Sequence, residues 1–482
     1  MSFLRTPATV SALTALLLSG CSLAPHYSRP AQPIPASFKE EPGWRVARPA
    51  DDVAKGEWWK LFNDPVLDAL EARVLVSNQN LAAAEAAYRQ ARATVSEQRA
   101  ALLPTVDLSA GATRAGTFGS GTTRINNSGG VESSTSNGSR RYTVSIGASW
   151  EPDLWGRIGS AVRQARANAE ASHADLVNAT LSAQGELALD YVQLRGIEAQ
   201  QAILAATIKA YERALAITTN RYNAGVVARV DVLQAESQLR SARGDAADLE
   251  RQRAIFEHAI AVLVGENPST FAIAPAAWNR TVPEVPGVLP SALIERRPDV
   301  AAAERRVAAA NQQIGIERAA FFPTIGLSGN LGANSSTLGS LFTAASSVWS
   351  LGVTGALTLL DFGARAARVR EARAAYDQAV ATYRQTVLTA FQQTEDELAA
   401  VRVLARVGTE RTAAAVAANR VEQLTQNQYL AGIIGYSDVI TAQTTALSAR
   451  RTEASAIVDR QVAAISLIQA IGGTWVDSDP AR

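Results

Sequence analysis

The sequence contains few of the side chains on which most metal and nucleophilic chemistry depends. It has one cysteine, Cys21, and three histidines, His26, His173 and His258, which lie far apart. A single cysteine excludes an intrachain disulfide, and the histidine spacing fits no metal site. The sequence also lacks a phosphate-binding loop and a nucleophile elbow. We therefore expect no enzyme, no cofactor and no metal.

An excess of one charge is missing too, as are long hydrophobic runs beyond the N-terminus. Lys and Arg together number 46 and Asp and Glu 45, a net charge of +1. No overall field therefore attracts nucleic acid, and we expect no nucleic-acid partner. Beyond the first residues no run of about 18 apolar residues occurs, so we expect no transmembrane helix. If such a chain crosses a membrane, it must do so as strands.

Residues 1–20 are typical of a signal peptide, with an apolar run from Val10 to Leu18 followed by small residues. Cys21 comes next, and the tetrapeptide that it ends resembles the bacterial lipobox, in which the thiol carries acyl chains such as palmitate. We expect Cys21 to carry a covalent lipid that anchors the chain. By the lipoprotein sorting pattern, Ser22 favours the outer membrane. The alternative is a buried free cysteine.

One turn occurs twice and organises the rest of the chain. Tyr222, Ala224-Gly225 and Asp231-Val232 recur 207 residues later as Tyr429, Ala431-Gly432 and Asp438-Val439. Each glycine stands where a left-handed residue closes a helix at lowest cost. The sequence predicts two helix–turn–helix tips, at 222–231 and 429–438.

The repetition extends beyond the tips and predicts two structural repeats, 58–267 and 291–473. Each should hold a helix, a β-hairpin, a helix of roughly 70 residues, or 100 Å, a tip and a returning helix. A proline-rich tether, 21–57, precedes them, a proline-rich connector, 268–290, joins them, and a tail, 474–482, follows. The expected fold is mainly α with a small β part.

Local signals set the ends and the packing of the helices. Asp64 and Pro65 suit the N-cap and first position of a helix that runs to Leu102 with a break near Asn78. In the first long helix, apolar residues spaced by seven predict supercoiled helices. The series consists of Leu187, Leu194, Gln201, Ile208, Leu215 and Tyr222, with Ile197, Leu204 and Tyr211 as a companion series.

Two segments change to a two-residue period and predict antiparallel hairpins. In 104–150, apolar residues alternate with small polar ones on both sides of a polar stretch, 114–140, which should be a loop. In 323–360 the pattern recurs with a shorter loop. The second strand of this pair should include Leu357 and Leu359.

Four strands with one apolar and one polar face can lie in a bilayer only if the sheet edges are closed. One chain cannot close them. Two chains would give a barrel of eight strands, whose interior side chains nearly fill it. Three chains would give a barrel of twelve strands that leaves a lumen. We expect three chains. The alternatives are a soluble sheet with one wet face and, for the helices alone, a coiled-coil stalk.

The order of these features resembles the outer-membrane efflux channel family typified by TolC, in its lipoprotein branch. The resemblance covers nearly all of the mature chain. Its residues are Cys21, the Trp59-to-Pro65 and Glu151-to-Arg157 runs, Arg297-Pro298-Asp299 and the two tips. It implies a homotrimer in the outer membrane of a Gram-negative bacterium, with a twelve-stranded transmembrane β-barrel, four strands per chain, and an α-barrel tunnel across the periplasm. The implied partners are a periplasmic adaptor (membrane fusion) protein and an inner-membrane transporter, of the RND type.

The resemblance also implies roles at the tips. Asp438 matches an aspartate ring at the tunnel's constriction; the alternative is a solvated aspartate that caps the start of its helix. Tyr429 and Asp231 match a hydrogen-bonded pair that holds the tips shut, whereas Ile434 replaces an arginine of some relatives. The adaptor-docking turns would be Ala224, Gly225, Val226, Ala431, Gly432 and Ile433, against the alternative of plain helix-closing geometry.

The function that follows is a passive, gated conduit for small molecules in a tripartite efflux pump. A periplasmic adaptor or structural coiled-coil lipoprotein is the rival from another class, and it should carry one helical hairpin and a compact β domain. A type I secretion exit duct is a further alternative. The sequence leaves the cargo open.

Overall fold

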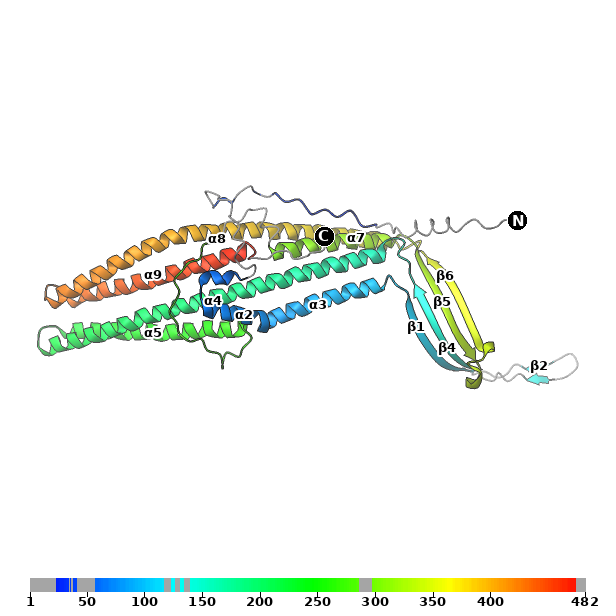
Figure 1. Cartoon of the computed structure of the whole chain (residues 1–482), viewed down its shortest axis with the longest axis horizontal. Coiled ribbons are helices and arrows are strands. Elements are labelled where there is room, and N and C mark those ends of the chain that lie inside the picture. The colour runs from blue at the N-terminus through cyan, green and yellow to red at the C-terminus, as the bar shows by residue number, and fades with distance from the viewer. Residues whose placement is uncertain are drawn as a thin grey trace. The chain divides into compact units, whose positions relative to one another are not determined.

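The computed structural model describes residues 23–33, 35, 38–40, 57–116, 123–125, 131–133, 139–285 and 297–473. These residues form long helices and one main sheet (Figure 1), so the expectation of a mainly α fold with a small β part is confirmed. The signal peptide 1–20, Cys21, most of the tether and the tail 474–482 lie outside the described residues.

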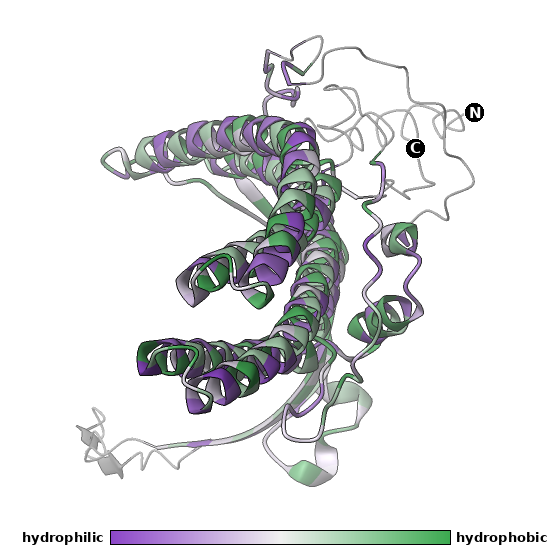
Figure 2. Cartoon of the chain, turned by 90° about the vertical axis from the view of Figure 1, so that its left-hand side faces the viewer, coloured by the Kyte–Doolittle hydropathy of each residue, from purple (hydrophilic) through white to green (hydrophobic). Residues whose placement is uncertain are grey.

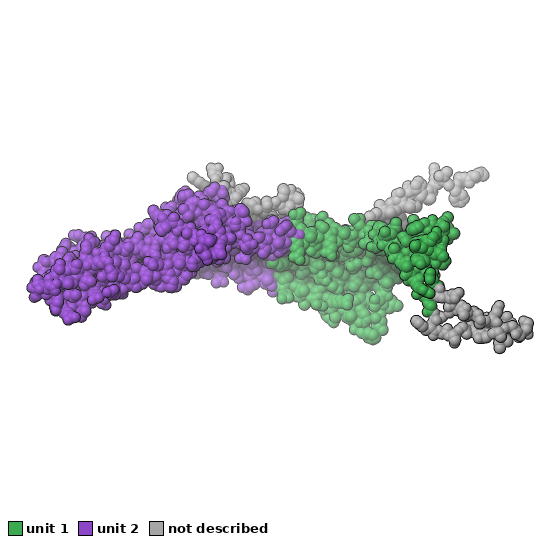
Figure 3. All heavy atoms as spheres, turned by 90° about the horizontal axis from the view of Figure 1, so that it is seen from below, with its two compact units in different colours: residues 1–29, 90–169, 306–379 green, residues 30–89, 170–305, 380–482 purple. Residues whose placement is uncertain are grey.

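The chain divides into two compact units (Figure 3). Unit 1 comprises residues 1–29, 90–169 and 306–379, and unit 2 comprises residues 30–89, 170–305 and 380–482. The main sheet belongs to unit 1. Both tips belong to unit 2.

Corresponding helices of the two repeats have equal lengths. Helices α3 (Gln79–Ala100) and α7 (Pro298–Ala319) have 22 residues each. The long helices α4 (Arg157–Asn223) and α8 (Ala364–Leu430) have 67 each, and the returning helices α5 (Arg229–Leu263) and α9 (Tyr436–Ala470) have 35 each. The helices of the two repeats therefore match one another in length.

The first helical segment starts and breaks where the sequence indicates. A short 3-10 helix, η1 (Trp58–Phe62), leads to α2 (Pro65–Ser77), and the Asp64 carboxylate accepts the backbone N–H groups of Val66 and Leu67. Asn78 separates α2 from α3. Its Oδ1 caps α3, and its Nδ2 donates to the Leu263 carbonyl at 2.8 Å.

The main sheet has the strand order β1-β4-β5-β6, antiparallel throughout (Figure 1). Its strands are β1 (Thr105–Ala115), β4 (Ser139–Trp150), β5 (Thr324–Ser335) and β6 (Ser347–Ala356). One cross-strand row is Leu108, Ile146, Leu331 and Trp349, and the adjacent row is Asp107, Gly147, Asn330 and Ser350. The sheet therefore has one apolar and one polar face, as predicted. The apolar face is exposed in the single chain, Leu351 at 81% and Val353 at 74%.

The sequence misplaces two details of the hairpins. The stretch 114–140 contains two further short strands, β2 (Thr123–Ile125) and β3 (Val131–Ser133), which pair with each other. The second correction concerns β6, which ends at Ala356, so the prediction of Leu357 and Leu359 as strand residues is wrong. Among the described strands β6 has only β5 as its neighbour, and β5 begins at Thr324 opposite Ala356, so residues beyond Ala356 have no strand to pair with.

The core of unit 2 follows the predicted seven-residue series. Leu187, Leu194 and Leu204 are fully buried, and Ile197 and Tyr211 nearly so, whereas Tyr222 at the end of the series is 41% exposed. Figure 2 shows hydrophobic and hydrophilic residues intermixed along the long helices. Among the described helices, none is both long and apolar enough to cross a membrane.

Buried polar groups connect the helices of unit 2 to the segment that follows α5. Tyr191 donates to Asp64 at 2.7 Å and accepts a hydrogen bond from Arg195 at 3.0 Å. Arg195 also pairs with Glu198 at 2.6 Å, which in turn binds Arg253 at 3.0 Å. The ion pair with Glu198 offsets part of the cost of burying Arg195, although the Arg195 Nη2 has no hydrogen-bond partner among the described residues.

One buried carboxyl in unit 2 lacks such compensation. Glu71 on α2 is fully buried, and neither of its carboxyl oxygens has a hydrogen-bond partner among the described residues. Burial, with a smaller contribution from the nearby Asp68 carboxylate, raises the pKa of Glu71 to about 9. Glu71 is therefore protonated at neutral pH.

The described part of the tether, residues 23–33, 35 and 38–40, has no helix or strand and is held by helices. In unit 1, Asn311 and Arg318 of α7 donate to the carbonyls of Pro25 and Leu23. In unit 2 the buried ring of Phe38 packs on Phe391 of α8. The Glu395 carboxylate accepts the next two backbone N–H groups, at 2.7 and 3.0 Å.

Candidate functional site at the hairpin tips

The two turns have the same backbone structure. At the first, the N–H groups of Gly225 and Val226 donate to the carbonyls of Tyr222 and Arg221, each at 2.9 Å. At the second, Gly432 and Ile433 donate to Tyr429 and Gln428, each at 3.0 Å. The glycines have φ of 74° and 75°. This is the Schellman closure, which satisfies the last helix carbonyls and requires a left-handed residue.

The turns present apolar side chains to solvent. Val226 is 61% exposed and Ile433 is 72% exposed, and the adjoining Ala and Gly of each turn, 224–225 and 431–432, are exposed as well. A methyl group added at Gly225 or Gly432 would meet no atom within 4 Å. The six residues singled out as docking turns thus form accessible surfaces, and their geometry is also that of a plain helix closure.

The two predicted tip aspartates occupy equivalent positions in the first turns of α5 and α9. Asp231 is half-buried and Asp438 is exposed. Asp438 has no hydrogen bond or ion pair to any described residue, so the residue carries an uncompensated charge at the tip. The N-cap of α9 is Gly435, without a side-chain cap, and the carboxylate of Asp438 still favours the positive end of the helix.

Tyr429 lies in a small core between the two tips. It is 3% exposed and clusters with Ala235, Tyr436 and Val439. Its ring centroid lies 5.3 Å from that of Tyr436, with the rings tilted by 53°. The Tyr429 hydroxyl has no hydrogen-bond partner among the described residues. The predicted Tyr429–Asp231 hydrogen bond is therefore not formed in this single chain.

Arg221 fixes Tyr429 in place of that hydrogen bond. Its guanidinium carbon lies 4.6 Å from the ring centroid, and its Nη1 donates to the Tyr429 backbone carbonyl at 3.3 Å. A cation over an aromatic face is attracted by the ring quadrupole. One side chain of the first tip thus holds both the ring and the main chain of the second.

Sequence reasoning overlooked Arg221 and Tyr436, although both stand inside the repeated motif. Arg221 directly precedes Tyr222, and Tyr436 is the first residue of α9. Burial is the main cause that raises the pKa of Tyr436 to about 12, with Tyr429 as the next cause. Ile434, which stands where some relatives carry arginine, packs against the same core.

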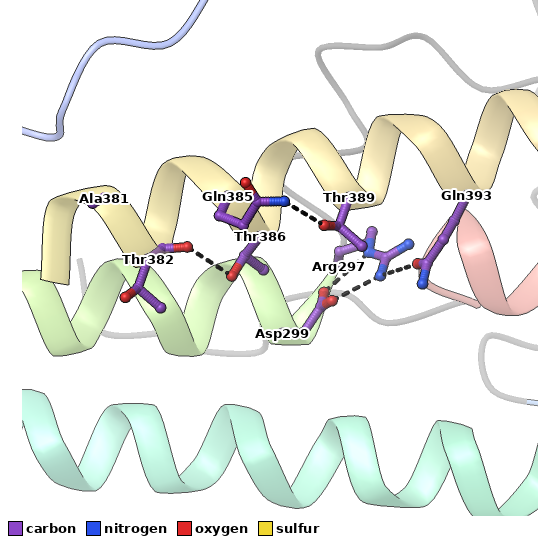
Figure 4. A pocket seen from close by; sticks show the side chains of 8 residues that line it. All are labelled: Arg297, Asp299, Ala381, Thr382, Gln385, Thr386, Thr389 and Gln393. Carbon is purple, nitrogen blue, oxygen red and sulfur yellow. Dashed lines mark hydrogen bonds and ion pairs between the residues drawn. The ribbon is translucent and has the colours of Figure 1, made fainter. Parts of the chain in front are cut away.

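A second polar region lies where α7 begins. Arg297 donates two hydrogen bonds to Asp299, at 3.0 and 2.7 Å, and one to Gln393 of α8 at 2.8 Å (Figure 4). It also donates to the last carbonyl of α9, that of Ala470, at 2.9 Å. An adjoining hollow of about 550 Å³ is lined mainly by Thr and Gln of α8. Because the guanidinium is occupied by these partners, Arg297 has a structural role here.

Metal chemistry finds no support in the part of the chain that the structure describes. No group of three or more His, Cys, Asp or Glu side chains there could hold a metal ion. The tips instead combine one exposed and one half-buried carboxylate, accessible apolar turns and a contact that joins two hairpins.

Comparison with known proteins gives consistent matches along the whole chain. A family model described as "Outer membrane efflux protein" matches residues 70–266 and 289–473. The outer membrane protein OprJ of Pseudomonas aeruginosa is 32% identical over 481 residues, 98% of this chain and 97% of OprJ. The probable efflux pump outer membrane protein TtgC of Pseudomonas putida is 29% identical over 469 residues, with 97% and 95% covered. The solved structure of the outer-membrane channel OprN has a TM-score of 0.82 at 28% identity and covers 94% of this chain and 99% of that one.

Proposed function

The chain belongs to the outer membrane efflux protein family, and from that membership we propose that it is the outer-membrane channel of a tripartite efflux pump. In this role it is a passive, gated conduit that carries small molecules from the periplasm to the outside. The observation that carries the proposal is the twofold repeat of hairpin, long helix and tip, both copies of which the family model matches. A single-hairpin adaptor would have only one copy.

We propose that the channel is a homotrimer. The apolar face of the main sheet is exposed in the single chain, and the outermost strands β1 and β6 each have one neighbour among the described strands. In a bilayer these edges must be closed by pairing. Three copies supply twelve strands around a lumen lined by the polar face.

The anchoring and the partners follow from the same proposal. A lipid on Cys21 would tether the channel to the outer membrane of a Gram-negative bacterium. The exposed turns at Val226 and Ile433 suit an apolar contact with a periplasmic adaptor protein. Energy would come from an inner-membrane transporter, of the RND type that the family resemblance implies. A type I secretion duct is less well supported, because the matching family model is described as an efflux protein and TtgC is named for an efflux pump.

We propose further that the tips are the gate. Asp438 supplies one exposed carboxylate per chain, and three on a common axis would attract cations and narrow the aperture. Tyr429 is buried between the tips, and its hydroxyl has no hydrogen-bond partner among the described residues. A rearrangement of the tips can therefore bring this hydroxyl within hydrogen-bond distance of Asp231.

Size-exclusion chromatography with light scattering, in detergent, tests the assembly. The expected result is the mass of three chains and a gel mobility that changes on boiling, as closed barrels show. A folded monomer whose mobility is insensitive to heat would contradict the proposal.

A further inference from the structure

The turn before each long helix makes different contacts in the two repeats. In the first repeat, the Trp155 ring stacks on Phe322, with 4.8 Å between centroids and an interplanar angle of 27°. Its Nε1 donates to the Pro323 carbonyl at 2.7 Å. Phe322 and Pro323 lead into β5 and belong to the second repeat. Trp155 therefore joins the first repeat to the second.

The second repeat carries the same kind of residue without such a partner. Phe362 stands 207 residues after Trp155, and each is followed by a glycine with positive φ, Gly156 at 69° and Gly363 at 91°. Phe362 is 93% exposed. Its own φ of 51° is a left-handed conformation that is strained for a bulky side chain. No ring or hydrogen-bond contact of the Phe362 side chain occurs among the described residues.

The site that Phe362 would need is present on the first repeat. By the spacing of the repeats, Leu103 and Pro104 correspond to Phe322 and Pro323. Leu103 is 67% exposed. Within one chain, the second repeat has no following repeat to contact. The matching partner is the first repeat of another copy.

The strands lead to the same arrangement. β4 of the first repeat pairs with β5 of the second, and this pairing places Ile146 opposite Leu331. The equivalent strands, β6 and β1, are the two outermost strands of the sheet. The corresponding register places Val353 opposite Ala112, and both residues lie on the apolar face. A register shifted by one residue would bring a polar residue onto that face.

We propose that Phe362 packs on Leu103 and Pro104 of a second copy of this chain, while β6 pairs with β1 of that copy with Val353 opposite Ala112. This inference rests on the trimeric channel proposed above, and it assigns the contact and the register that close the barrel. It also explains why β6 stops at Ala356 in the single chain. β4 runs to Trp150, whose equivalent is Leu357, so pairing with β1 of the next copy extends β6 by that residue.

Disulfide trapping tests the register in the full-length chain. Opposite residues of an antiparallel pair lie about 4.5–5.5 Å apart at Cα, within the range that a disulfide bridges. The variant carrying Val353→Cys and Ala112→Cys is purified in detergent and treated with an oxidant. We expect covalent dimers and trimers on a non-reducing gel, and loss of both on reduction. Ile146→Cys with Leu331→Cys, the template pair within one chain, should form a disulfide without adding mass.

The controls separate the inference from the function on which it rests. Each single variant and the wild-type chain, whose only cysteine is Cys21, should give no ladder. Val353→Cys with Gly111→Cys, on opposite faces, should give none either. A trimer by light scattering that cross-links in another register, or not at all, overturns the inference and leaves the channel standing. A folded monomer overturns both.

The Phe362 contact has its own readout. Phe362→Ala removes a side chain that is exposed in the single chain, so it leaves the fold of each chain intact and should lower the temperature at which the trimer dissociates on a gel. Leu388→Ala is the matched control, because Leu388 on α8 is exposed as well, at 53%, and should leave this temperature unchanged. An unchanged dissociation temperature for Phe362→Ala would overturn its assignment to the interface.

Discussion

The guanidinium of Arg221 lies 4.6 Å from the ring centroid of Tyr429 and joins the end of α4 to the end of α8. The Tyr429 carbonyl that accepts from Arg221 also accepts the N–H of Gly432, which closes the second turn. The position of one tip is thereby coupled to that of the other. This contact and the small apolar core around Tyr429 join the hairpins at their ends, where position 434 carries isoleucine.

The first prediction concerns this contact. Arg221→Ala should destabilise the tips, because the ring and the carbonyl of Tyr429 lose their partner. A double-mutant cycle of Arg221→Ala and Tyr429→Leu, measured by hydrogen exchange of the tip amides, should give a coupling of about 0.5–2 kcal/mol. Arg213→Ala, an exposed arginine on the same helix, is the control. Additive effects of the two substitutions would show that Arg221 and Tyr429 do not act together.

A second prediction concerns the aperture. Asp438→Asn removes the exposed charge but keeps the size of the side chain, so it should raise the single-channel conductance or weaken block by divalent cations. Glu410→Gln, an exposed carboxylate in the middle of α8, is the matched control and should leave both quantities unchanged. Equal currents for Asp438→Asn and the wild-type chain would show that Asp438 does not line the constriction.

The turn glycines provide a third prediction. Gly225→Ala and Gly432→Ala should each destabilise their tip by about 1–2 kcal/mol, because the left-handed backbone, and not crowding, is what excludes a side chain there. Gly244→Ala is the control. Gly244 also has open space around it but lies inside α5 with no positive φ, so alanine should stabilise the helix by up to about 1 kcal/mol. A neutral Gly225→Ala would be inconsistent with the Schellman closure.

The fourth prediction is a pH dependence. Since the pKa of Glu71 is about 9 in the folded state, against an ordinary value of 4.5, the folded state binds more protons than the unfolded state between these values. The free energy of unfolding should therefore fall as pH rises from about 5 to 9. Glu71→Gln should flatten this dependence and stabilise unit 2 at pH 8 by on the order of 1–3 kcal/mol.

Thermal unfolding of wild-type and Glu71→Gln chains across this pH range is the measurement. Glu85→Gln, an exposed glutamate on α3, serves as the control and should retain the wild-type slope. If the free energy of unfolding of Glu71→Gln fell with pH as steeply as that of the wild-type chain, a group other than Glu71 would be responsible for the pH dependence.

The sequence predicts the helices and strands well because each signal is local. Asp64, Asn78 and the turn glycines set helix ends through their own backbone bonds, and the two-residue period of the strands reports the two faces of the sheet. The repeat adds a constraint that a single segment lacks. Corresponding helices must match in length, and they do.

What the sequence does not predict depends on contacts between distant segments. In the sequence, Arg221 resembles any cation near the end of a helix, and nothing in the local pattern distinguishes it from Arg213. Its contact with Tyr429 becomes evident only in the folded structure. The prediction of the end of β6 is wrong for a related reason. The alternation continues to Leu357 and Leu359, but β5 begins opposite Ala356, so within the chain these residues have no strand to pair with.

The most direct test of the central claim is single-channel recording of the purified full-length protein in a planar lipid bilayer. The account predicts discrete, stable conductance steps from folded, heat-modifiable protein, with a larger step for Asp438→Asn. Protein that remains folded and inserts into the bilayer, yet never conducts, would contradict the assignment as an outer-membrane channel.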